Sequence, residues 1–478
     1  MVAKASLLSL AAAAPLLLAT IVQAAAAGDR LVRRQDEVEL PGTPGHYSAP
    51  DYYNSHIGVD WNRTYDVYEP QQIHLSLGSE SKFARVEFAT LESVYKAIFK
   101  YWPKSKKHLV AISKGQDWTF VDGGSAKRPL YLHKIKSKTL KPATTYEYQV
   151  GTLSSKGLQW SSVYEFHTAS RRKDFNFIAT ADIGINNAVA LPHIIEAAKS
   201  HKYDFITVSG DQAYNMDDFN GTKGDEFLNL WQEVYARTPF MGVPGNHEAA
   251  YNYSHFKNRF DNLPYLESHF DNSLLYSFDY KSLHLISFST ELYFDGTPEM
   301  LQTGLNWLEA DLQEANRHRE QRPWIVLITH HPVYCSADSE DCTSKAALIR
   351  DGPLTADNKT HWGGLEELLL KYKVDVYLSG HVHNYERTYP VAQGKVASTS
   401  YHNAPSYMEV IVGNGGQPEQ TVPFNTTGPF ADWSAKRYDG YGFSLVNVSP
   451  KTFKMTHYEA KLDGSLGRVI DEFTLSKD

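Results

Sequence analysis

Residues 174–184 read DFNFIATADIG, an apolar run that ends abruptly at Asp182. Four later runs end in the same way: YDFITVSGDQAY (203–214), PFMGVPGNH (239–247), PWIVLITHH (323–331) and VDVYLSGHVH (374–383). Short, continuous apolar runs of this kind indicate strands that are buried on both faces, as in the parallel sheets of α/β proteins. Because sites in open α/β sheets form beyond the carboxyl ends of strands, we expect the polar residues after these runs to converge on one edge.

The segments around these runs extend the α/β pattern from residue 171 to residue 478. AVALPHIIEAAKSH (188–201) and GGLEELLLKYK (363–373) are predicted helices, and YSFDYKSLHLISF (276–288) is a predicted antiparallel hairpin. The C-terminal runs 407–416, 441–448 and 451–460 have strand patterns. Two mixed sheets packed face to face are therefore expected.

Residues 69–170 have a different texture, in which short β-rich runs alternate with turns and show no helical period. We predict a β-sandwich of the fibronectin type III kind. Tyr146 in LKPATTYEYQVG would be its structural corner residue. We assign no catalysis to this domain.

The polar residues at the five strand ends are all side chains that can bind metal. They are Asp182, Asp211, Asn246 with His247, His330 with His331, and His381 with His383. A single one is most simply a capping aspartate or a core histidine. Five strands that end this way point to a clustered functional site.

Taken as ATADIG, VSGDQAY, VPGNHE, LITHH and LSGHVH, these blocks resemble the metallophosphoesterase superfamily, and within it the purple acid phosphatases. The superfamily has a histidine two residues after its first aspartate, whereas this chain has Gly184 there and Tyr214 three residues after Asp211. The resemblance implies an α/β fold, an αββα sandwich of two mixed sheets, with two adjacent metal ions. Phenolate is a hard anionic ligand that suits Fe(III).

The resemblance also implies a role for each residue. Asp182, Tyr214 and His383 would hold Fe(III), Asn246, His330 and His381 would hold a divalent ion (zinc, manganese or iron), and Asp211 would bridge the two. Hydroxide bound to the metals would attack the phosphorus of a phosphate monoester. His247 would protonate the leaving group, with a packed histidine behind the ligands as the alternative.

His381 and His383 are two positions apart, so they point to opposite sides of a strand unless the chain turns, which Gly380 would permit.

His331 is a candidate second catalytic residue, or it points into the core. We expect His193 on a helix surface. Glu386 and Arg387 would support the ligands or contact substrate.

The segment HPVYCSADSEDCT (331–343) lacks the further histidines of plant-type members and resembles the animal and fungal branch with its loop bounded by cysteines. Cys335 and Cys342 are expected to form a disulfide, with free thiols as the alternative. Asp338, Glu340 and Asp341 are expected to be a solvated acidic loop.

Residues 1–27 have the pattern of a secretory signal peptide, with an N-terminal membrane anchor as the alternative. Residues 28–68 would be a propeptide or linker, in which Arg33-Arg34 is a processing site or a solvated charge pair. The glycosylation sequons begin at Asn62, Asn220, Asn252, Asn358, Asn425 and Asn447. A secreted, extracellular or cell-wall glycoprotein without a later membrane span is expected.

The 478 residues carry 47 Lys and Arg against 55 Asp and Glu, a net charge of −8, which argues against nucleic-acid binding. The predicted partner is a small phosphorylated substrate. The metals alone do not exclude a phosphodiesterase or nucleotide pyrophosphatase, and a non-catalytic adhesion or binding glycoprotein is a further alternative. That last alternative would require a lost ligand, and all seven positions are filled.

Overall fold

The computed structural model describes residues 63–78, 82–424 and 431–478, all within one compact unit that spans residues 44–478. The predicted signal peptide, Arg33-Arg34 and most of the predicted linker lie outside the described residues, as do the sequons at Asn62 and Asn425. Within the described ranges, no helix is long and apolar enough to cross a membrane.

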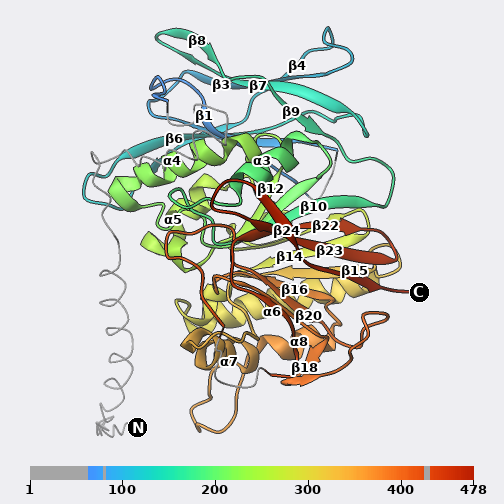
Figure 1. Cartoon of the computed structure of the whole chain (residues 1–478). Helices are drawn as coiled ribbons and strands as arrows, with labels where there is room; N and C mark the ends of the chain where they lie inside the picture. The colour runs from blue at the N-terminus through green and yellow to red at the C-terminus, as the bar shows by residue number, and fades with distance from the viewer. Residues whose placement is uncertain (1–62, 79–81, 425–430) are drawn as a thin grey trace, which may run out of the picture. The chain divides into compact units, whose positions relative to one another are not determined.

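The N-terminal part is a β-sandwich that lies at the top of Figure 1. One sheet contains, in order, β1 (Gln71–Ser76), β2 (Arg85–Thr90), β6 (Pro129–Lys136) and β5 (Gln116–Val121). The other contains β4 (Ala111–Ser113), β3 (Lys96–Pro103), β7 (Thr145–Ser154) and β8 (Gly157–Trp160), and β9 (Tyr164–His167) also pairs with β7. The Tyr146 hydroxyl accepts a hydrogen bond from the Lys141 amide at 3.0 Å, which is the geometry of a tyrosine corner.

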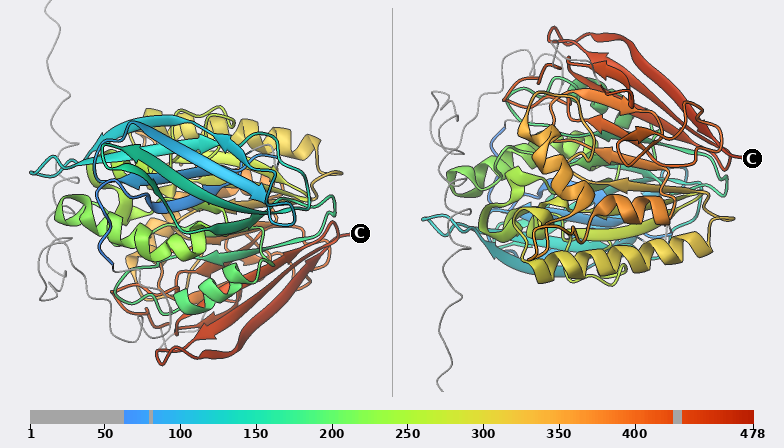
Figure 2. Two further views of the ribbon diagram at one scale, coloured as in Figure 1. Left: turned by 90° about the horizontal axis from the view of Figure 1, so that it is seen from above. Right: turned by 90° about the horizontal axis from the view of Figure 1, so that it is seen from below.

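The chain then enters a six-stranded mixed sheet that carries the first three metal-competent strand ends. Its strands are, in order, β12 (Phe240–Val243), β11 (Phe205–Ser209), β10 (Phe175–Thr180), β22 (Gly442–Val448), β23 (Thr452–Ala460) and β24 (Leu466–Ser476). The strands β10, β11 and β12 are parallel, and β22 joins β10 antiparallel. Figure 2 shows β23 and β24, in red, at one side of the molecule.

A seven-stranded mixed sheet supplies the other two strand ends. In order, it contains β13 (Leu275–Tyr280), β14 (Leu283–Phe288), β15 (Trp324–Ile328), β16 (Val376–Ser379), β20 (Met408–Val412), β17 (Tyr385–Thr388) and β21 (Ser434–Tyr438). The strands from β14 to β20 are parallel, and β13 pairs antiparallel with β14 as the predicted hairpin requires. A small separate hairpin is formed by β18 (Val391–Ala392) and β19 (Lys395–Val396).

The two sheets pack face to face, and helices cover their outer faces. Strand β15 shows the arrangement, because Trp324, Val326 and Ile328 join the core between the sheets while Ile325 and Leu327 pack under the helices. The helices are α3 (Leu191–Lys199), α4 (Asp218–Tyr235) and α5 (Ala250–Arg259) with the first sheet, and α6 (Pro298–Arg317), α7 (Ser344–Asp351) and α8 (Leu365–Lys371) with the second. This is the predicted αββα sandwich.

Two local predictions are wrong. The first predicted helix is shorter than 188–201, because α3 begins at Leu191. His193 does not lie on its surface: it is buried and stacks on Phe443 of β22, with ring centroids 6.0 Å apart. The outer face of the first sheet continues under α3, so the side of the helix that carries His193 faces the core.

Candidate metal centre

The polar residues predicted from the sequence all follow strand ends. Asp182 comes two residues after β10, Asp211 two after β11, and Asn246 three after β12, at the start of a short 3-10 helix, Asn246–Glu248. His330 follows β15, and His381 follows β16. Since these parallel strands run in the same direction within each sheet, their carboxyl ends deliver the side chains to one place.

The backbone at these positions is unusual. Asp182, Asp211, Tyr214 and His381 have φ angles of 52°, 49°, 52° and 67°, in the left-handed region that side chains with a Cβ rarely adopt. Each such residue costs on the order of 1 kcal/mol, and such costs persist where the surrounding structure imposes them, most often at functional sites. The turn between His381 and His383 is made by His381 itself and not by Gly380, which corrects the sequence prediction.

Two motif glycines are required by close approach. A Cβ on Gly210, whose φ is 88°, would collide with the His330 ring. A Cβ on Gly380 would collide with the Asp182 carboxylate. The glycines in VSGD and LSGH therefore make room for ligand atoms that come from other strands.

The first group of donors consists of Asp182, Tyr214 and His383. The Tyr214 hydroxyl lies 3.3 Å from Asp182 Oδ1 and 3.0 Å from His383 Nε2, and His383 Nε2 lies 3.5 Å from Asp182 Oδ1. All three residues are buried. Burial, and then the carboxylates of Asp182 and Asp211, raise the pKa of Tyr214 well above its ordinary value, so a phenolate here requires a cation close by.

The second group consists of Asn246, His330 and His381. Asn246 Oδ1 lies 3.0 Å from both His330 Nε2 and His381 Nδ1, and these two nitrogens are 3.2 Å apart. Asp211 Oδ2 lies 3.1 Å from His330 Nε2. Donor atoms of Asp182, Asp211 and His330 lie within 4.8 Å of one another, so Asp211 stands next to both groups.

Each histidine of the two groups has its second ring nitrogen held by an oxygen from elsewhere in the chain. His330 Nδ1 donates to the Ser209 carbonyl at 2.8 Å, and His383 Nδ1 donates to the Gln420 carbonyl at 3.1 Å. His381 Nε2 lies 3.0 Å from Asp341 Oδ1. The two carbonyl bonds fix the tautomers of His330 and His383 and leave their inward nitrogens with a lone pair, which is the usual state of a metal-binding histidine. The contact of His381 with Asp341 is a charge contact without the alignment of a hydrogen bond.

The donor set fits two metal ions. Ligand atoms that surround one ion at about 2.1 Å stand about 3.4 Å apart when the geometry is tetrahedral, and the distances within each group are 3.0–3.5 Å. The set combines carboxylate, phenol, amide and imidazole, and includes no lysine or arginine. Buried carboxylates need a compensating positive charge, which two ions sharing Asp211 would supply.

Glu248 supports this arrangement and was not predicted. Its buried carboxylate accepts the backbone amides of Asp211, Gln212 and Gly245 at 3.0, 2.9 and 2.8 Å, and so ties the loop after β11 to the loop after β12. Burial, together with the Asp211 charge, raises the pKa of Glu248 to about 7. Its position directly after Asn246-His247 in VPGNHE was the only signal available in the sequence.

His247 lies at the open edge of the centre. Its Nδ1 donates to Asn215 Oδ1 at 2.9 Å, while its Nε2 lies 3.5 Å from Glu419 Oε1 and 4.0 Å from Asp211 Oδ2. Although burial opposes the charged form, the carboxylates of Asp211 and Glu419 raise the pKa of His247 to about 9. These carboxylates favour the protonated ring, whose Nδ1 is fixed by Asn215 and whose Nε2 faces Asp211 and Glu419.

His331 lies beside the second group. Its ring packs on His381, with centroids 3.7 Å apart, and its Nε2 lies 3.0 Å from Glu291 Oε1. The residue is 4% exposed. This contact is with a carboxylate inside the protein, so it does not assign His331 a direct catalytic role. That role stays a prediction.

Two of the predicted secondary residues act away from the ligands. Glu386 accepts the Ser336 amide at 2.8 Å, and Arg387 pairs with Asp471 at 2.6 Å. Both are buried and stabilise strand β17. By contrast, Asp341 was expected to be solvated, but its side chain is half-buried and contacts His381.

The cysteines form the expected disulfide, and the described sequons differ in exposure. Cys335 and Cys342 are bonded, with their Cα atoms 4.9 Å apart. Asn252, Asn358 and Asn447 are exposed, whereas Asn220 is half-buried and its side-chain oxygen accepts the Ala126 amide.

Comparisons with known proteins agree with this geometry. Residues 70–168 match the purple acid phosphatase N-terminal domain, residues 175–385 match the calcineurin-like phosphoesterases, and residues 406–472 match the iron/zinc purple acid phosphatase-like C-terminal family. Acid phosphatase type 7 of Homo sapiens is 35% identical over 427 residues, covering 87% of this chain and 93% of that protein. Phosphoenolpyruvate phosphatase of Allium cepa is 27% identical and covers 83% of this chain and 80% of its own length.

Among solved structures, the purple acid phosphatase PPD1 of yellow lupin (Lupinus luteus) seeds has the same fold. It superposes with a TM-score of 0.70 at 22% identity, and the match covers 86% of this chain and 75% of that one. The family models, the human relative and the shared fold confirm the resemblance that the strand-end motifs indicated. The chain therefore belongs to the purple acid phosphatases, a family of phosphoesterases that depend on a binuclear metal centre.

Proposed function

We propose that the protein is a secreted acid phosphatase that hydrolyses phosphate monoesters at a centre of Fe(III) and a divalent ion. The observation that carries the proposal is the Tyr214 hydroxyl, which lies 3.0 Å from His383 Nε2 and 3.3 Å from Asp182 Oδ1. A phenol directed at a carboxylate and an imidazole forms a hard, anionic donor set, and that set favours a trivalent ion.

The two halves of the centre have different donors. Asp182, Tyr214 and His383 would hold the ferric ion, and Asp211 would lie between the two ions. The second ion would be held by one amide and two imidazoles, from Asn246, His330 and His381, a neutral set that suits zinc, manganese or ferrous iron. When bound, the ions neutralise the phosphate charge and activate water as the nucleophile.

His247 would supply the proton for the leaving group. Asn215 fixes its Nδ1, so the proton to be transferred is at Nε2, on the side of Asp211. The carboxylates of Asp211 and Glu419 favour the protonated ring, which makes a proton available for transfer. Glu419, with an exposed carboxylate 3.5 Å from the same nitrogen, would orient the ring.

Monoester hydrolysis is supported by the names of two relatives, acid phosphatase type 7 and phosphoenolpyruvate phosphatase. Secretion is supported by the N-terminal sequence pattern, by the exposed sequons at Asn252 and Asn358, and by the disulfide. The phosphodiesterase alternative uses the same metal ligands, so it must be separated by experiment.

The test is metal analysis together with a visible spectrum. We expect iron and a second metal in equal amounts, and a purple colour that Tyr214→Phe abolishes. Tyr95→Phe, which changes a tyrosine that is 74% exposed on the sandwich, is the matched control and should keep the colour. A colourless, fully active protein that contains only zinc would contradict the proposal.

Substrate class is tested in the same preparation with nitrophenyl phosphate and bis-nitrophenyl phosphate. We expect faster release from the monoester at acidic pH. Faster release from the diester would assign the protein to the phosphodiesterases.

A further inference from the structure

The loop between the two cysteines folds back on the metal centre. The chain leaves β15 at Ile328, passes the ligand His330 to Cys335, and returns from this loop through a short 3-10 helix, Glu340–Cys342, which is followed by α7. Asp341 lies in this short helix, directly before the bonded Cys342. Its half-buried side chain reaches the ring of His381.

The contact between Asp341 and His381 determines which ring nitrogen faces the centre. Asp341 Oδ1 lies 3.0 Å from His381 Nε2, and on the other side of the ring His381 Nδ1 lies 3.0 Å from Asn246 Oδ1. The contact lacks the alignment of a hydrogen bond, but a carboxylate this close to Nε2 still favours a proton there by charge, which leaves the lone pair of Nδ1 for a metal. Without it, the ring could rotate or change tautomer.

Asp341 is itself held in place from two sides. Lys345 in α7 donates to Asp341 Oδ1 at 3.0 Å, which neutralises the carboxylate and fixes its direction. The disulfide fixes the backbone on the other side. Cys335 and Cys342 pack in one small apolar cluster with Val382, the residue between the ligands His381 and His383.

We propose that Asp341 is a positioning residue for His381, and that the Cys335–Cys342 disulfide holds it in place, so that binding of the divalent ion depends on the disulfide. This inference rests on the proposed role of His381 as a ligand. The half of the centre formed by Asp182, Tyr214 and His383 has its histidine held by a backbone carbonyl, that of Gln420, and so depends less on the loop.

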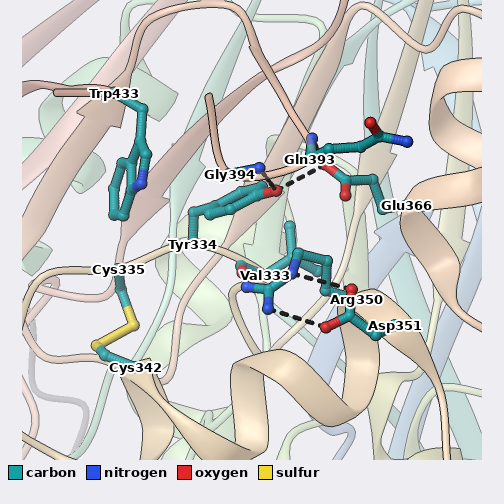
Figure 3. A pocket seen from close by; sticks show the side chains of 10 residues that line it. All are labelled: Val333, Tyr334, Cys335, Cys342, Arg350, Asp351, Glu366, Gln393, Gly394 and Trp433. Carbon is teal, nitrogen blue, oxygen red and sulfur yellow. Dashed lines mark hydrogen bonds and ion pairs between the residues drawn. A yellow bond between two sulfur atoms is a disulfide. The ribbon is translucent and has the colours of Figure 1, made fainter. Parts of the chain in front are cut away.

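The disulfide can be reached in the folded protein. It lines a cavity of about 350 Å³ whose walls also include Tyr334, Trp433 and Arg350 (Figure 3). The polar groups there bond to one another: the Tyr334 hydroxyl donates to Glu366 at 2.8 Å, and Arg350 pairs with Asp351 at 2.9 Å. A small reductant that enters this cavity would meet the sulfur atoms.

The first experiment measures Co²⁺ binding to metal-depleted full-length protein by calorimetry and by the visible absorption of the bound ion. We expect two sites in the unmodified protein. Asp341→Asn should weaken one of them by about 10–100-fold, because residues that orient a metal-binding histidine have effects of this size. It should also change the spectrum of that site and leave the other unaltered.

The matched control is Glu340→Gln, which removes the same charge from an exposed neighbour in the same short helix. Its Co²⁺ affinities and spectra should equal those of the unmodified protein. Equal affinities in Asp341→Asn and Glu340→Gln would overturn the inference.

His381→Ala separates a failure of this inference from a failure of the proposed function. If His381→Ala loses one Co²⁺ site and Asp341→Asn keeps both, only the positioning role is wrong. If His381→Ala also keeps both sites at full affinity, His381 is not a ligand and the assigned ligand set fails first.

The disulfide is tested by a double-mutant cycle with the Cys335→Ser/Cys342→Ser pair. The serine pair should weaken the same site as Asp341→Asn, and the combined variant should be no weaker than the more affected of the two, because both changes release the same ring. Additive effects would show that the disulfide does not act through Asp341. If the serine pair does not fold, reduction of the native protein with a phosphine gives the same comparison.

Discussion

Two clusters of buried ionisable side chains can be compared in this molecule, one at the strand ends and one where the β-sandwich meets the helices. At the strand ends, Asp182, Asp211 and Tyr214 face one another and three histidines with their acceptor atoms inward. Between the sandwich and the helices, Arg259 of α5 is fully buried and bonds to Asp225, to the Gly221 carbonyl and to Gln72.

The second cluster contains its own cations. Arg259 Nη1 lies 2.9 Å from Asp225 Oδ1, and Arg128 Nη2 lies 2.8 Å from Asp225 Oδ2. His255 accepts from Arg259 Nε at 3.2 Å and faces Asp122 at 2.8 Å. Burial, and then the Arg259 charge, lower the pKa of His255 to about 4, so the ring is neutral and its Nε2 donates to Asp122.

The difference between them distinguishes structural from functional burial of charge. The cluster around Arg259 pairs its carboxylate, Asp225, with two guanidinium groups and holds the two parts of the chain together. The strand-end cluster has more acceptors than internal donors and is built on left-handed backbone at four of its residues. It needs cations from outside, whereas the other does not.

The largest expected effect comes from removing Asp211, the carboxylate next to both groups of the strand-end cluster. Asp211→Ala should lower phosphatase activity by about 10³-fold or more if it is the bridging ligand we propose, because the two ions would lose their common ligand and with it several kcal/mol of transition-state stabilisation. Metal content and kcat/KM measure this. Asp439→Ala, an exposed carboxylate, is the control, and a variant of Asp211 with full metal content and activity would contradict the assignment.

Breaking the cluster around Arg259 should affect folding and not metal binding. Arg259→Met removes the guanidinium from its four partners, Asp225, the Gly221 carbonyl, Gln72 and His255, and should cost about 3–5 kcal/mol in the free energy of unfolding. Urea denaturation measures the loss, with Lys257→Met on the same helix as control, since that ammonium bonds to Asn252 at the surface. The idea is wrong if Arg259→Met loses metal at an unchanged free energy of unfolding.

A third cluster of ionisable side chains, His284 with Asp279 and Asp311, predicts that the stability of the protein depends on pH. His284 lies 2.8 Å from both Asp279 and Asp311, whose carboxylates overcome the effect of burial and raise its pKa to about 9. A raised pKa means stabilisation that is fully present below the unfolded value near 6.5 and is lost as the pH rises through 9. The shift corresponds to up to about 3 kcal/mol.

The measurement compares His284→Gln with the unmodified protein by urea denaturation between pH 6 and pH 10. The difference in the free energy of unfolding should be greatest at pH 6 and should shrink toward pH 10. A difference that is constant over this range would show that His284 is neutral in the folded protein.

The smallest of these effects concerns His247, at the open edge of the strand-end cluster. His247→Ala should slow hydrolysis of alkyl phosphates by about 10²-fold, since general acid catalysis typically contributes that much or more. Nitrophenyl phosphate has a good leaving group and should be affected less. Comparing kcat for the two substrates checks this, and equal losses would remove the role as proton donor.

The fold could be predicted because each of its decisive strands is continuous in the sequence and ends in a polar residue. The hairpin at 276–288 and the tyrosine corner at Tyr146 were predictable for the same reason, since local pattern determines them. Helix α6 is absent from the predictions although its signals are local. Thr297 caps its N-terminus, Pro298 begins it, and Leu301, Leu305, Leu308 and Leu312 form its buried face.

Other features depend on contacts between distant segments and were not predictable. An acidic loop is normally expected to be exposed to solvent. Asp341 is half-buried instead, because the loop closed by the disulfide returns to His381. The burial of His193 depends on Phe443 in a strand near the C-terminus. The support from Glu248 depends on amides after a different strand, which no local pattern in the sequence reveals.

The positions of the ligands along the chain also affect how the protein matures. His381 donates its backbone amide to Asp182, which lies 199 positions earlier in the sequence, and Tyr214 is 169 positions from His383. Contacts of such long range form late in folding, because closing large loops is slow. We therefore expect the centre to assemble only after both sheets have paired, so that the ions are captured by a protein that is already folded.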